Sequence, residues 1–348
     1  MSADKKQDAY KRAGVDIDAA SDALSRFKAR VKETFTEGVL SDVGNFGGMF
    51  SLAGLEMEEP VLISSADGVG TKLIVAQKAG RHDTVGRCLV NHCVDDIMVQ
   101  GARPLFFMDY ISTGKLEPAH IDEVMTGFID GCKENGVALL GGETAEMPDL
   151  YAPGDYDLAG FIVGVAERKR LLTGERVKPG HILVGMPSSG LHTNGYSLAR
   201  KVLFQQMGLD VHDPLPGGKG ETVGEALLAV HKSYKKPLEI LLARELIDAA
   251  AHITGGGLTD NLPRVFGTGM HAEIETASWD VPRLFEVLVD EGGVDEMEAC
   301  RVFNMGIGMV VFVAEDNLDE VAGAIGMQGE EARIIGRIAA GDGRVVYL

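Results

Sequence analysis

Residues 60–80 read PVLISSADGVGTKLIVAQKAG, and this stretch decides the class of fold. An apolar run of strand-forming residues is cut by the glycine loop DGVGTK at 67–72, and helix-forming residues follow it. The pattern predicts a strand, a sharp turn and a helix. Similar strands, loops and helices interleave along both halves of the chain, which predicts a mixed α/β protein. The sequence alone does not distinguish parallel from antiparallel pairing of the strands.

The length of the chain predicts two domains. A chain of 348 residues is longer than one hydrophobic core usually serves. We place the domains at 1–172 and 173–348, because the periodic pattern lapses around ERVKPGH at 175–181 and restarts with the strand HILVGM. Within the first domain we expect a helix behind the possible caps Asp16 and Asp18, with Leu24, Phe27 and Val31 at helical spacing. We expect further elements at 84–101, 105–113, 117–136, 137–140 and 156–167.

The composition excludes several classes of protein. The 33 basic and 52 acidic side chains give a formal charge of -19, which disfavours binding to nucleic acid or to anionic membrane surfaces. The chain has no apolar run of about 18 residues that could span a bilayer and no secretory signal at its polar start, so we expect a cytoplasmic protein. Four scattered cysteines, without a C-x-x-C pair, are expected to be reduced core residues. The 45 glycines fall mostly in short clusters, which indicates tight loops.

The loop at 67–72 is the first candidate site. Its glycines let the backbone approach a bulky anion, the N–H groups of the following helix point outward, and Lys72 adds a positive charge. We therefore assign ATP phosphates to this loop, with Asp67 placed to hold a metal; the loop residues are Gly68, Val69, Gly70, Thr71 and Lys72. The alternative is an ordinary strand-to-helix turn, since the spacing is not that of the Walker phosphate loop.

Two further acidic positions complete a predicted metal site. On the helix at 84–101, His92 and Asp96 are four residues apart and share a face, next to Asp95. Glu143 follows two glycines in GGETAEMPD, where we expect a tight turn at the end of a strand. Asp67, Asp96 and Glu143 together offer the oxygen ligands that Mg²⁺ prefers. A solvated helix end is the alternative for the acids at 95 and 96.

Loops in the second half are candidate substrate sites. SSGLHTNGY at 188–196 offers hydroxyl, imidazole and amide groups, from which we select Ser189, His192 and Asn194, with His192 also a candidate proton shuttle. TGGGLTDN at 254–261 is a second possible anion cradle, through Gly255, Gly256 and Gly257, although three glycines could equally serve a crowded contact. For His82 and Trp279 we expect a surface or packing role and not catalysis.

Several of these motifs together resemble one family. DGVGTK, VDDIMVQGARPLFFMDY, GGETAEMP, SSGLHTNGYSLAR and ITGGGLTDNLPRV, with YKRAGVDIDAA near the start and FNMGIGMVV near the end, resemble aminoimidazole ribonucleotide synthetase, also called phosphoribosylformylglycinamidine cyclo-ligase. The likeness covers nearly the whole chain in the expected order. GGETAEMP and the SSG-x-H-x-NGYS loop are its most specific parts.

The resemblance implies a fold, a reaction and an assembly. The fold would be of the α+β type, with amino-terminal domains that pair their sheets into a barrel-like interface in a homodimer, and with an active site between the domains. The family uses ATP to activate the formyl amide oxygen of formylglycinamidine ribonucleotide, after which a nitrogen of the same molecule closes the imidazole ring and phosphate leaves. Catalytic roles would fall to Asp67, Lys72 and His192, and the cofactors would be ATP and Mg²⁺.

Two positions depart from the family pattern, and two other readings stay open. Asp95 stands where relatives commonly carry asparagine, and Asn45 interrupts a run that is usually richer in glycine.

Selenophosphate synthetase and thiamine-monophosphate kinase belong to the same structural superfamily and are alternative functions, but no cysteine precedes Cys88 to serve the chemistry of the synthetase. A kinase would transfer phosphate to its product. A catalytically silent nucleotide-binding scaffold is the alternative from a different class.

Overall fold

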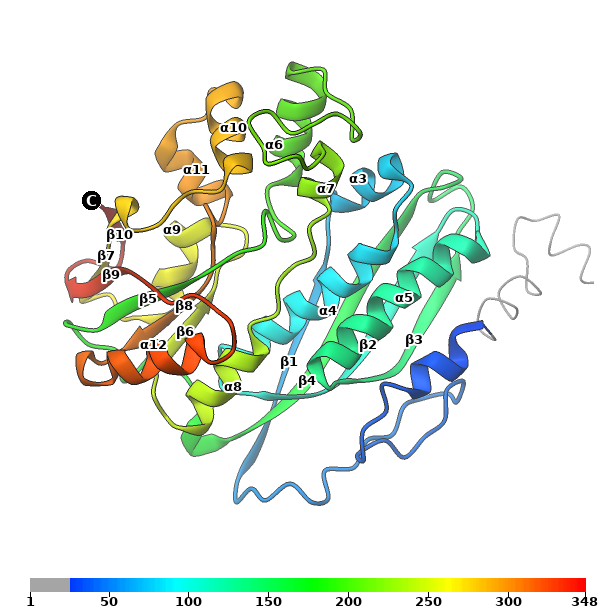
Figure 1. Ribbon diagram of the computed structural model, residues 1–348. Coiled ribbons are helices and arrows are strands. Elements are labelled where there is room, and N and C mark those ends of the chain that lie inside the picture. Colours follow the sequence, from blue (N-terminus) through cyan, green and yellow to red (C-terminus); the bar gives the residue numbers. More distant parts are fainter. Residues whose placement is uncertain (1–25) are drawn as a thin grey trace, which may run out of the picture.

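The computed structural model describes residues 26–348, and its strands form two separate sheets with helices packed against them (Figure 1). Both halves of the chain contain strands and helices, so the predicted mixed α/β fold is confirmed. Residues 26–32 are helical, whereas Leu24 and the YKRAGVDIDAA motif lie outside the described residues.

The first sheet has four strands in the order β1-β4-β2-β3. Their bounds are β1 (Pro60–Gly68), β2 (Arg103–Thr113), β3 (Ala138–Glu146) and β4 (Tyr156–Glu167). β4 pairs antiparallel with β1 and β2, and β2 pairs parallel with β3. The helices of this half are α3 (Lys72–Ala79), α4 (Asp83–Met98) and α5 (Pro118–Asn135).

Helices α4 and α5 cover one face of this sheet (Figure 1). The two helices approach closely because Gly86 and Gly127 lack a side chain where they meet. A Cβ atom on Gly86 would lie only 2.4 Å from the Val124 carbonyl oxygen, and one on Gly127 only 2.4 Å from the Asp83 carbonyl oxygen. The opposite face, which we call the open face, carries large apolar side chains in contact with solvent. Leu62, Met108 and Phe161 are 59%, 37% and 47% exposed there.

The second sheet has six strands in the order β10-β7-β9-β5-β8-β6. Their bounds are β5 (Ile182–Pro187), β6 (Ala249–His252), β7 (Met270–Ile274), β8 (Ile307–Val313), β9 (Arg333–Ala340) and β10 (Val345–Tyr347). The helices are α6 (Tyr196–Arg200), α7 (Val223–Leu227), α8 (Lys235–Ala243), α9 (Gly257–Asn261), α10 (Arg283–Gly292), α11 (Glu296–Val302) and α12 (Leu318–Gly326). A π-helical segment, Lys201–Gln206, and short 3-10 turns complete this half.

Two local predictions need correction. GGETAE belongs to strand β3, so Glu143 lies inside a strand and not on a tight turn, because its backbone pairs with β2 up to Glu146. Of the four cysteines, all of them free, Cys88, Cys93 and Cys132 are buried as predicted, but Cys300 is only half-buried. One hydrophobic cluster includes residues of both halves, and the domain boundary at 172/173 stays a prediction.

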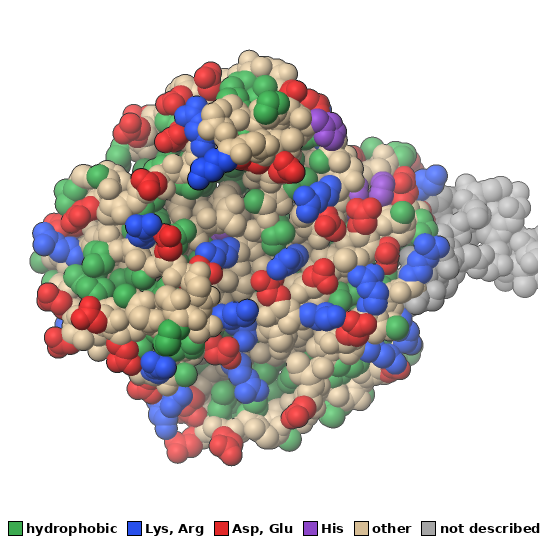
Figure 2. All heavy atoms as spheres, in the orientation of Figure 1, with side chains coloured by type: hydrophobic (Ala, Val, Ile, Leu, Met, Phe, Trp, Pro, Cys, Tyr) green, Lys and Arg blue, Asp and Glu red, His purple; other side chains and the backbone are tan. Residues whose placement is uncertain are grey.

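The distribution of charged side chains on the surface is relevant to the kinds of partner that the protein can bind. Figure 2 shows acidic and basic side chains intermixed over one face of the molecule, without a continuous basic area. No helix within residues 26–348 is long and apolar enough to cross a membrane.

Candidate active site between the two halves

Two of the predicted metal ligands meet beside the helix-covered face of the first sheet. Asp67 comes from the end of β1 and Asp96 from the last turn of α4. The Ser65 hydroxyl lies 3.0 Å from Asp67 Oδ2 and 3.1 Å from Asp96 Oδ2. One hydroxyl proton cannot be donated to both carboxylates at once, so the pair requires a further proton or a cation.

The electrostatics of the pair support this reading. Burial and the adjacent Asp96 raise the pKa of Asp67 to about 7. Burial would also raise the pKa of Asp96, but the hydrogen bond from His252 and the charge of that ring lower it below the ordinary value. Asp96 is therefore the charged member, and Asp67 holds a proton up to about neutral pH in the absence of a cation.

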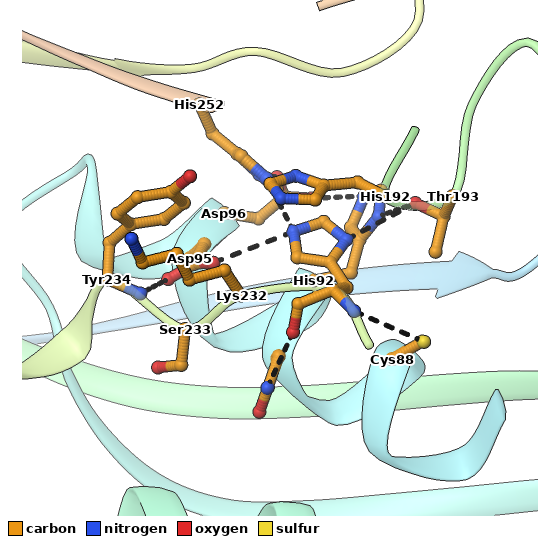
Figure 3. A network of polar contacts seen from close by, with 12 residues as sticks. Cys88, His92, Asp95, Asp96, His192, Thr193, Lys232, Ser233, Tyr234 and His252 are labelled. Carbon is orange, nitrogen blue, oxygen red and sulfur yellow. Dashed lines mark hydrogen bonds and ion pairs between the residues drawn. The ribbon is translucent and has the colours of Figure 1, made fainter. Parts of the chain in front are cut away.

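Four histidines surround the carboxylates, and Figure 3 shows the rings of His92, His192 and His252 gathered next to Asp95 and Asp96. His252 Nδ1 lies 2.7 Å from Asp96 Oδ1, and its Nε2 lies 3.0 Å from Nε2 of His231. His231 stacks on His192 with ring centres 4.0 Å apart. These rings join β6 and two loops of the second half to helix α4.

Asp95 is the fully buried acid of this region. Its Oδ1 accepts the backbone N–H of Tyr234 at 2.9 Å, and its Oδ2 lies 3.7 Å from His231 Nε2 without a hydrogen-bond partner among the described residues. Burial raises the pKa of Asp95 to about 8, although the His252 charge and the Tyr234 N–H oppose the shift. The acids at 95 and 96 are thus not a solvated helix end.

Lys72 has different partners from the phosphate oxygens expected of it. The side chain is fully buried at the start of α3. Its Nζ donates to the carbonyl oxygens of His192 at 2.9 Å and Ala229 at 2.7 Å, and lies 3.1 Å from Cys88 Sγ. Burial alone would lower the pKa of Lys72, but the Cys88 thiol and the Tyr196 hydroxyl raise it. The ammonium group joins the two halves, and these three partners use all of its protons.

The rest of the predicted phosphate loop is partly accessible. Gly70 has a φ of 53° and opens onto free space, and Gly68 and Gly70 are exposed. Val69 is buried in the core. Thr71 precedes α3, and its hydroxyl lies 3.3 Å from that of Ser197 on α6. Phosphate binding by Gly68, Val69, Gly70 and Thr71 stays a prediction.

Glu143 does not join Asp67 and Asp96 within one chain. Across the sheet, Glu143 is in line with Tyr110, Ala159 and Gly68, whereas Asp67 is one residue earlier on β1. Neighbouring residues of a strand point to opposite faces, so Glu143 lies on the open face. Three strand spacings of about 4.8 Å also separate it from β1. A shared metal site with Glu143 would need a second subunit.

The structure brings the two predicted substrate loops together. A Cβ atom on Gly255 would lie 3.1 Å from Asn194 Oδ1. Gly256 and Gly257 have φ values of 101° and 55°, and a Cβ atom on Gly257 would lie 2.1 Å from the Cys300 carbonyl oxygen. Gly257 therefore meets a packing requirement, which is the alternative left open by the sequence. The Ser189 hydroxyl donates to the Val230 carbonyl oxygen at 2.6 Å.

His192 is buried and strained, with a φ of 59°. Its Nε2 accepts the Ser189 N–H at 3.2 Å, and its Nδ1 has no partner within the described part of the chain. Burial and the charges of His252 and Lys72 lower the pKa of His192 well below its usual value, so the ring is neutral. Left-handed backbone at a non-glycine residue is typical of functional sites.

A cavity of about 460 Å³ opens beside the carboxylates, within the range of small-molecule sites. The ionisable residues of its lining are Asp96, His252 and Arg264; the other polar residues are Ser64, Ser65, Gln100, Thr173, Thr254 and Asn261. The Arg264 guanidinium forms no ion pair with any residue from 26 to 348. The lining thus includes both acidic and basic side chains.

The donor set fits a divalent cation at Asp67 and Asp96, because the two carboxylates lie on either side of the Ser65 hydroxyl and offer the oxygen ligands that such ions prefer. His192, His231 and His252 also lie close enough to suggest a metal site. However, the rings of His192 and His231 are stacked at 23°, so their in-plane lone pairs do not converge on one ion. The carboxylate pair is the better candidate.

Sequence reasoning missed several residues of this site. His231 stands in no pattern that indicates chemistry. Arg264 lies inside the motif ITGGGLTDNLPRV, and His252 lies two residues before the glycine loop at 254–257, so both could have been found by position. The packing roles expected for His82 and Trp279 agree with their contacts. His82 Nδ1 lies 2.9 Å from the Tyr156 hydroxyl, and Trp279 Nε1 donates to the Met305 carbonyl oxygen at 2.9 Å.

Known proteins resemble this chain along its length. Residues 53–166 match the family model of the AIR synthase related protein, N-terminal domain, and residues 178–348 match that of the C-terminal domain. A phosphoribosylformylglycinamidine cyclo-ligase of Bacillus cereus (strain ZK / E33L) is 50% identical over 335 residues, 96% of each chain.

Solved structures share the fold at lower identity. Thiamine-monophosphate kinase from Stenotrophomonas maltophilia K279a superposes with a TM-score of 0.70 at 19% identity, over 93% of this chain and 95% of that one. The hydrogenase maturation protein HypE of E. coli gives 0.65 at 17% identity, over 93% and 92%. From the family models and the curated relatives together, the chain belongs to the phosphoribosylformylglycinamidine cyclo-ligase, or AIR synthase, family.

Proposed function

We propose that this protein catalyses the ATP-dependent closure of formylglycinamidine ribonucleotide to aminoimidazole ribonucleotide in purine biosynthesis, with release of ADP and phosphate. The 50% identity to a named cyclo-ligase over 96% of both chains carries the proposal. The carboxylate pair beside a cavity between the two halves supports it, since phosphoryl transfer depends on holding charge and reactants in place.

The chain's own residues would position two substrates. Asp67 and Asp96 would hold Mg²⁺, which neutralises charge on the phosphates when bound. The exposed backbone at Gly68 and Gly70 leaves room for the triphosphate. Arg264 would bind the phosphate of the ribonucleotide, so that the formyl amide points toward Asp96 and His252. Once the amide oxygen is phosphorylated, it leaves as phosphate when the ring nitrogen attacks.

Lys72 and His192 take roles that differ from the first expectation. We infer that Lys72 positions the loop at 188–195, through the His192 carbonyl oxygen, without touching a phosphate. His192 is neutral and has an unpartnered Nδ1. Because Nε2 accepts the Ser189 N–H, Nδ1 carries the ring proton and is available as a hydrogen-bond donor.

The proposal includes a homodimer, which the open face supports, and a location in the cytoplasm. Leu62, Met108 and Phe161 would be covered by the same face of a second copy, and Glu143 on that face would then approach the partner. Phe161→Asp should convert dimer to monomer in sedimentation velocity. A wild-type protein that sediments as a monomer at micromolar concentration would contradict the assembly.

One assay tests the function directly. The purified chain with ATP, Mg²⁺ and formylglycinamidine ribonucleotide should form the imidazole product and release one phosphate for each ring. A kinase would instead leave its phosphate on the organic product, which mass spectrometry of the product distinguishes. Hydrolysis of ATP without imidazole formation would contradict the proposal.

A further inference from the structure

The two nitrogens of the His92 ring have the surroundings that are usual for a metal-binding histidine. Its Nδ1 lies 2.6 Å from the Thr193 hydroxyl, and its Nε2 lies 3.4 Å from Asp67 Oδ1 and 3.7 Å from Asp96 Oδ2. Metal-binding histidines commonly donate the other ring N–H to an oxygen acceptor, which fixes the tautomer. The Thr193 hydroxyl is placed to accept that proton here, and in this tautomer the Nε2 lone pair faces both carboxylates.

The spacing of these atoms is unsuited to a hydrogen bond. N–H···O bonds have donor–acceptor distances of about 2.7–3.2 Å, shorter than both separations from Nε2. Two ligand atoms at about 2.1 Å from one tetrahedral metal ion lie roughly 3.4 Å apart. A cation among the three groups also removes the repulsion between an imidazole lone pair and two carboxylate oxygens.

The carboxylates beside His92 are partly exposed to solvent, although the ring itself is buried. Asp67 and Asp96 keep side-chain exposures of 30% and 26%, so an ion can reach the site.

We propose that His92 Nε2 is a third protein ligand of the cation held by Asp67 and Asp96, and that this site therefore prefers a first-row transition ion to Mg²⁺. Mg²⁺ favours oxygen ligands in octahedral geometry, whereas imidazole suits Co²⁺ and Zn²⁺ better. The inference rests on the cation site of the proposed function and adds a ligand and a metal preference to it.

The neighbouring groups support the assignment to His92. His252 Nδ1 is engaged with Asp96 Oδ1, so His252 orients a ligand without being one. Asp95 lies 3.7 Å from His231 and accepts the Tyr234 N–H, so these contacts are with residues other than His92. Lys72 is fully occupied by the His192 and Ala229 carbonyl oxygens and Cys88.

Calorimetric titration of the metal-free full chain with Co²⁺ and with Mg²⁺ tests the proposal. The wild type should bind Co²⁺ more tightly than Mg²⁺. His92→Gln offers an oxygen in place of Nε2 and should leave Mg²⁺ binding nearly unchanged. It should weaken Co²⁺ binding at least about tenfold, because the loss of a residue that only supports a ligand already costs about that much affinity. Bound Mn²⁺ should show nitrogen coupling in electron spin echo spectra, and His92→Gln should abolish it.

Two control variants make the result interpretable. His82→Gln removes a buried histidine that precedes the same helix and contacts Tyr156, and it should bind both ions as the wild type does. Asp67→Asn should weaken both ions. Thermal melting of each metal-free variant checks that it is folded.

The outcomes separate this inference from the function. An unchanged Co²⁺ affinity in His92→Gln, or no nitrogen coupling in the wild type, would overturn the role of His92. Unchanged binding in Asp67→Asn would overturn the cation site as well. If His92→Gln loses the preference for Co²⁺ but the wild type forms no imidazole, the role of His92 as a metal ligand stands and the cyclo-ligase function is contradicted.

Discussion

The two faces of the first sheet differ sharply, although the acids on them come from equally conspicuous motifs. On the helix-covered face, Asp67 meets Asp96, His92 and His252. On the open face, Glu143 shares its side of the sheet with the exposed apolar side chains of Met108 and Phe161. A one-residue step along a strand decides the face. Acidic residues at strand ends therefore form one site only where the topology brings them to the same face.

The largest expected effect tests whether the two faces cooperate across a dimer. Asp67→Asn should lower kcat on the order of 10²–10³-fold, because it removes charge stabilisation of the transition state. If Glu143 contributes to the partner's site, Glu143→Gln should also be impaired, and mixing the two variants should restore one intact site in each mixed dimer.

The mixing experiment measures imidazole formation after the two variants exchange subunits. Activity of the mixture above that of either variant alone would show that Asp67 and the partner subunit's Glu143 belong to one active site. Loss in both variants without recovery would contradict a contribution of Glu143 across the interface.

Lys72 gives the next largest effect, this time on stability. Lys72→Met leaves the buried carbonyl oxygens of His192 and Ala229 without a charged donor, and it should lower the free energy of unfolding by about 2–5 kcal/mol. Lys78→Met on the same helix removes an exposed ion pair with Asp210 and should cost under about 1 kcal/mol. Urea denaturation measures both. Equal losses in the two variants would contradict the role of Lys72.

Asp95 should make stability depend on pH. Its folded pKa of about 8 lies above the ordinary value of 3.8, so the folded state holds a proton that the unfolded state releases. The stability from this group is present at low pH and is lost as pH rises from about 4 to about 8, by up to about 1.4 kcal/mol per pH unit.

Asp95→Asn should remove that loss, since an asparagine oxygen can still accept the Tyr234 N–H. The advantage of the variant over the wild type should therefore grow from pH 5 to pH 8 and then level off. Melting curves in EDTA across this range provide the measurement. Parallel curves for the two proteins would show that Asp95 ionises normally.

The smallest expected effect concerns Arg264 in the cavity. Arg264→Ala should raise KM for formylglycinamidine ribonucleotide about 10- to 100-fold, the value of a charged hydrogen bond, and should leave KM for ATP unchanged. Arg301→Ala, which removes an exposed partner of Asp260, is the matched control. A rise in KM for ATP instead would place the nucleotide phosphates at Arg264.

The sequence predicted the mixed fold and the family. Of the predicted metal ligands, the structure brings Asp67 and Asp96 together but not Glu143, and their metal binding stays a prediction. Asp67 and Asp96 could be found because a loop after a strand and the i, i+4 pair with His92 are local patterns. The partners of Lys72 could not be found, because contacts between the halves depend on tertiary packing. Two glycines weaken the strand pattern of GGETAE and predict a turn, yet pairing with β2 keeps the segment extended.

The most direct test of the central claim is a crystal structure of the protein with a non-hydrolysable ATP analogue and Mn²⁺, with anomalous scattering used to locate the ion. The account predicts a peak within about 2.3 Å of carboxylate oxygens of both Asp67 and Asp96. A peak bound elsewhere, with those two side chains still joined only through the Ser65 hydroxyl, would contradict it.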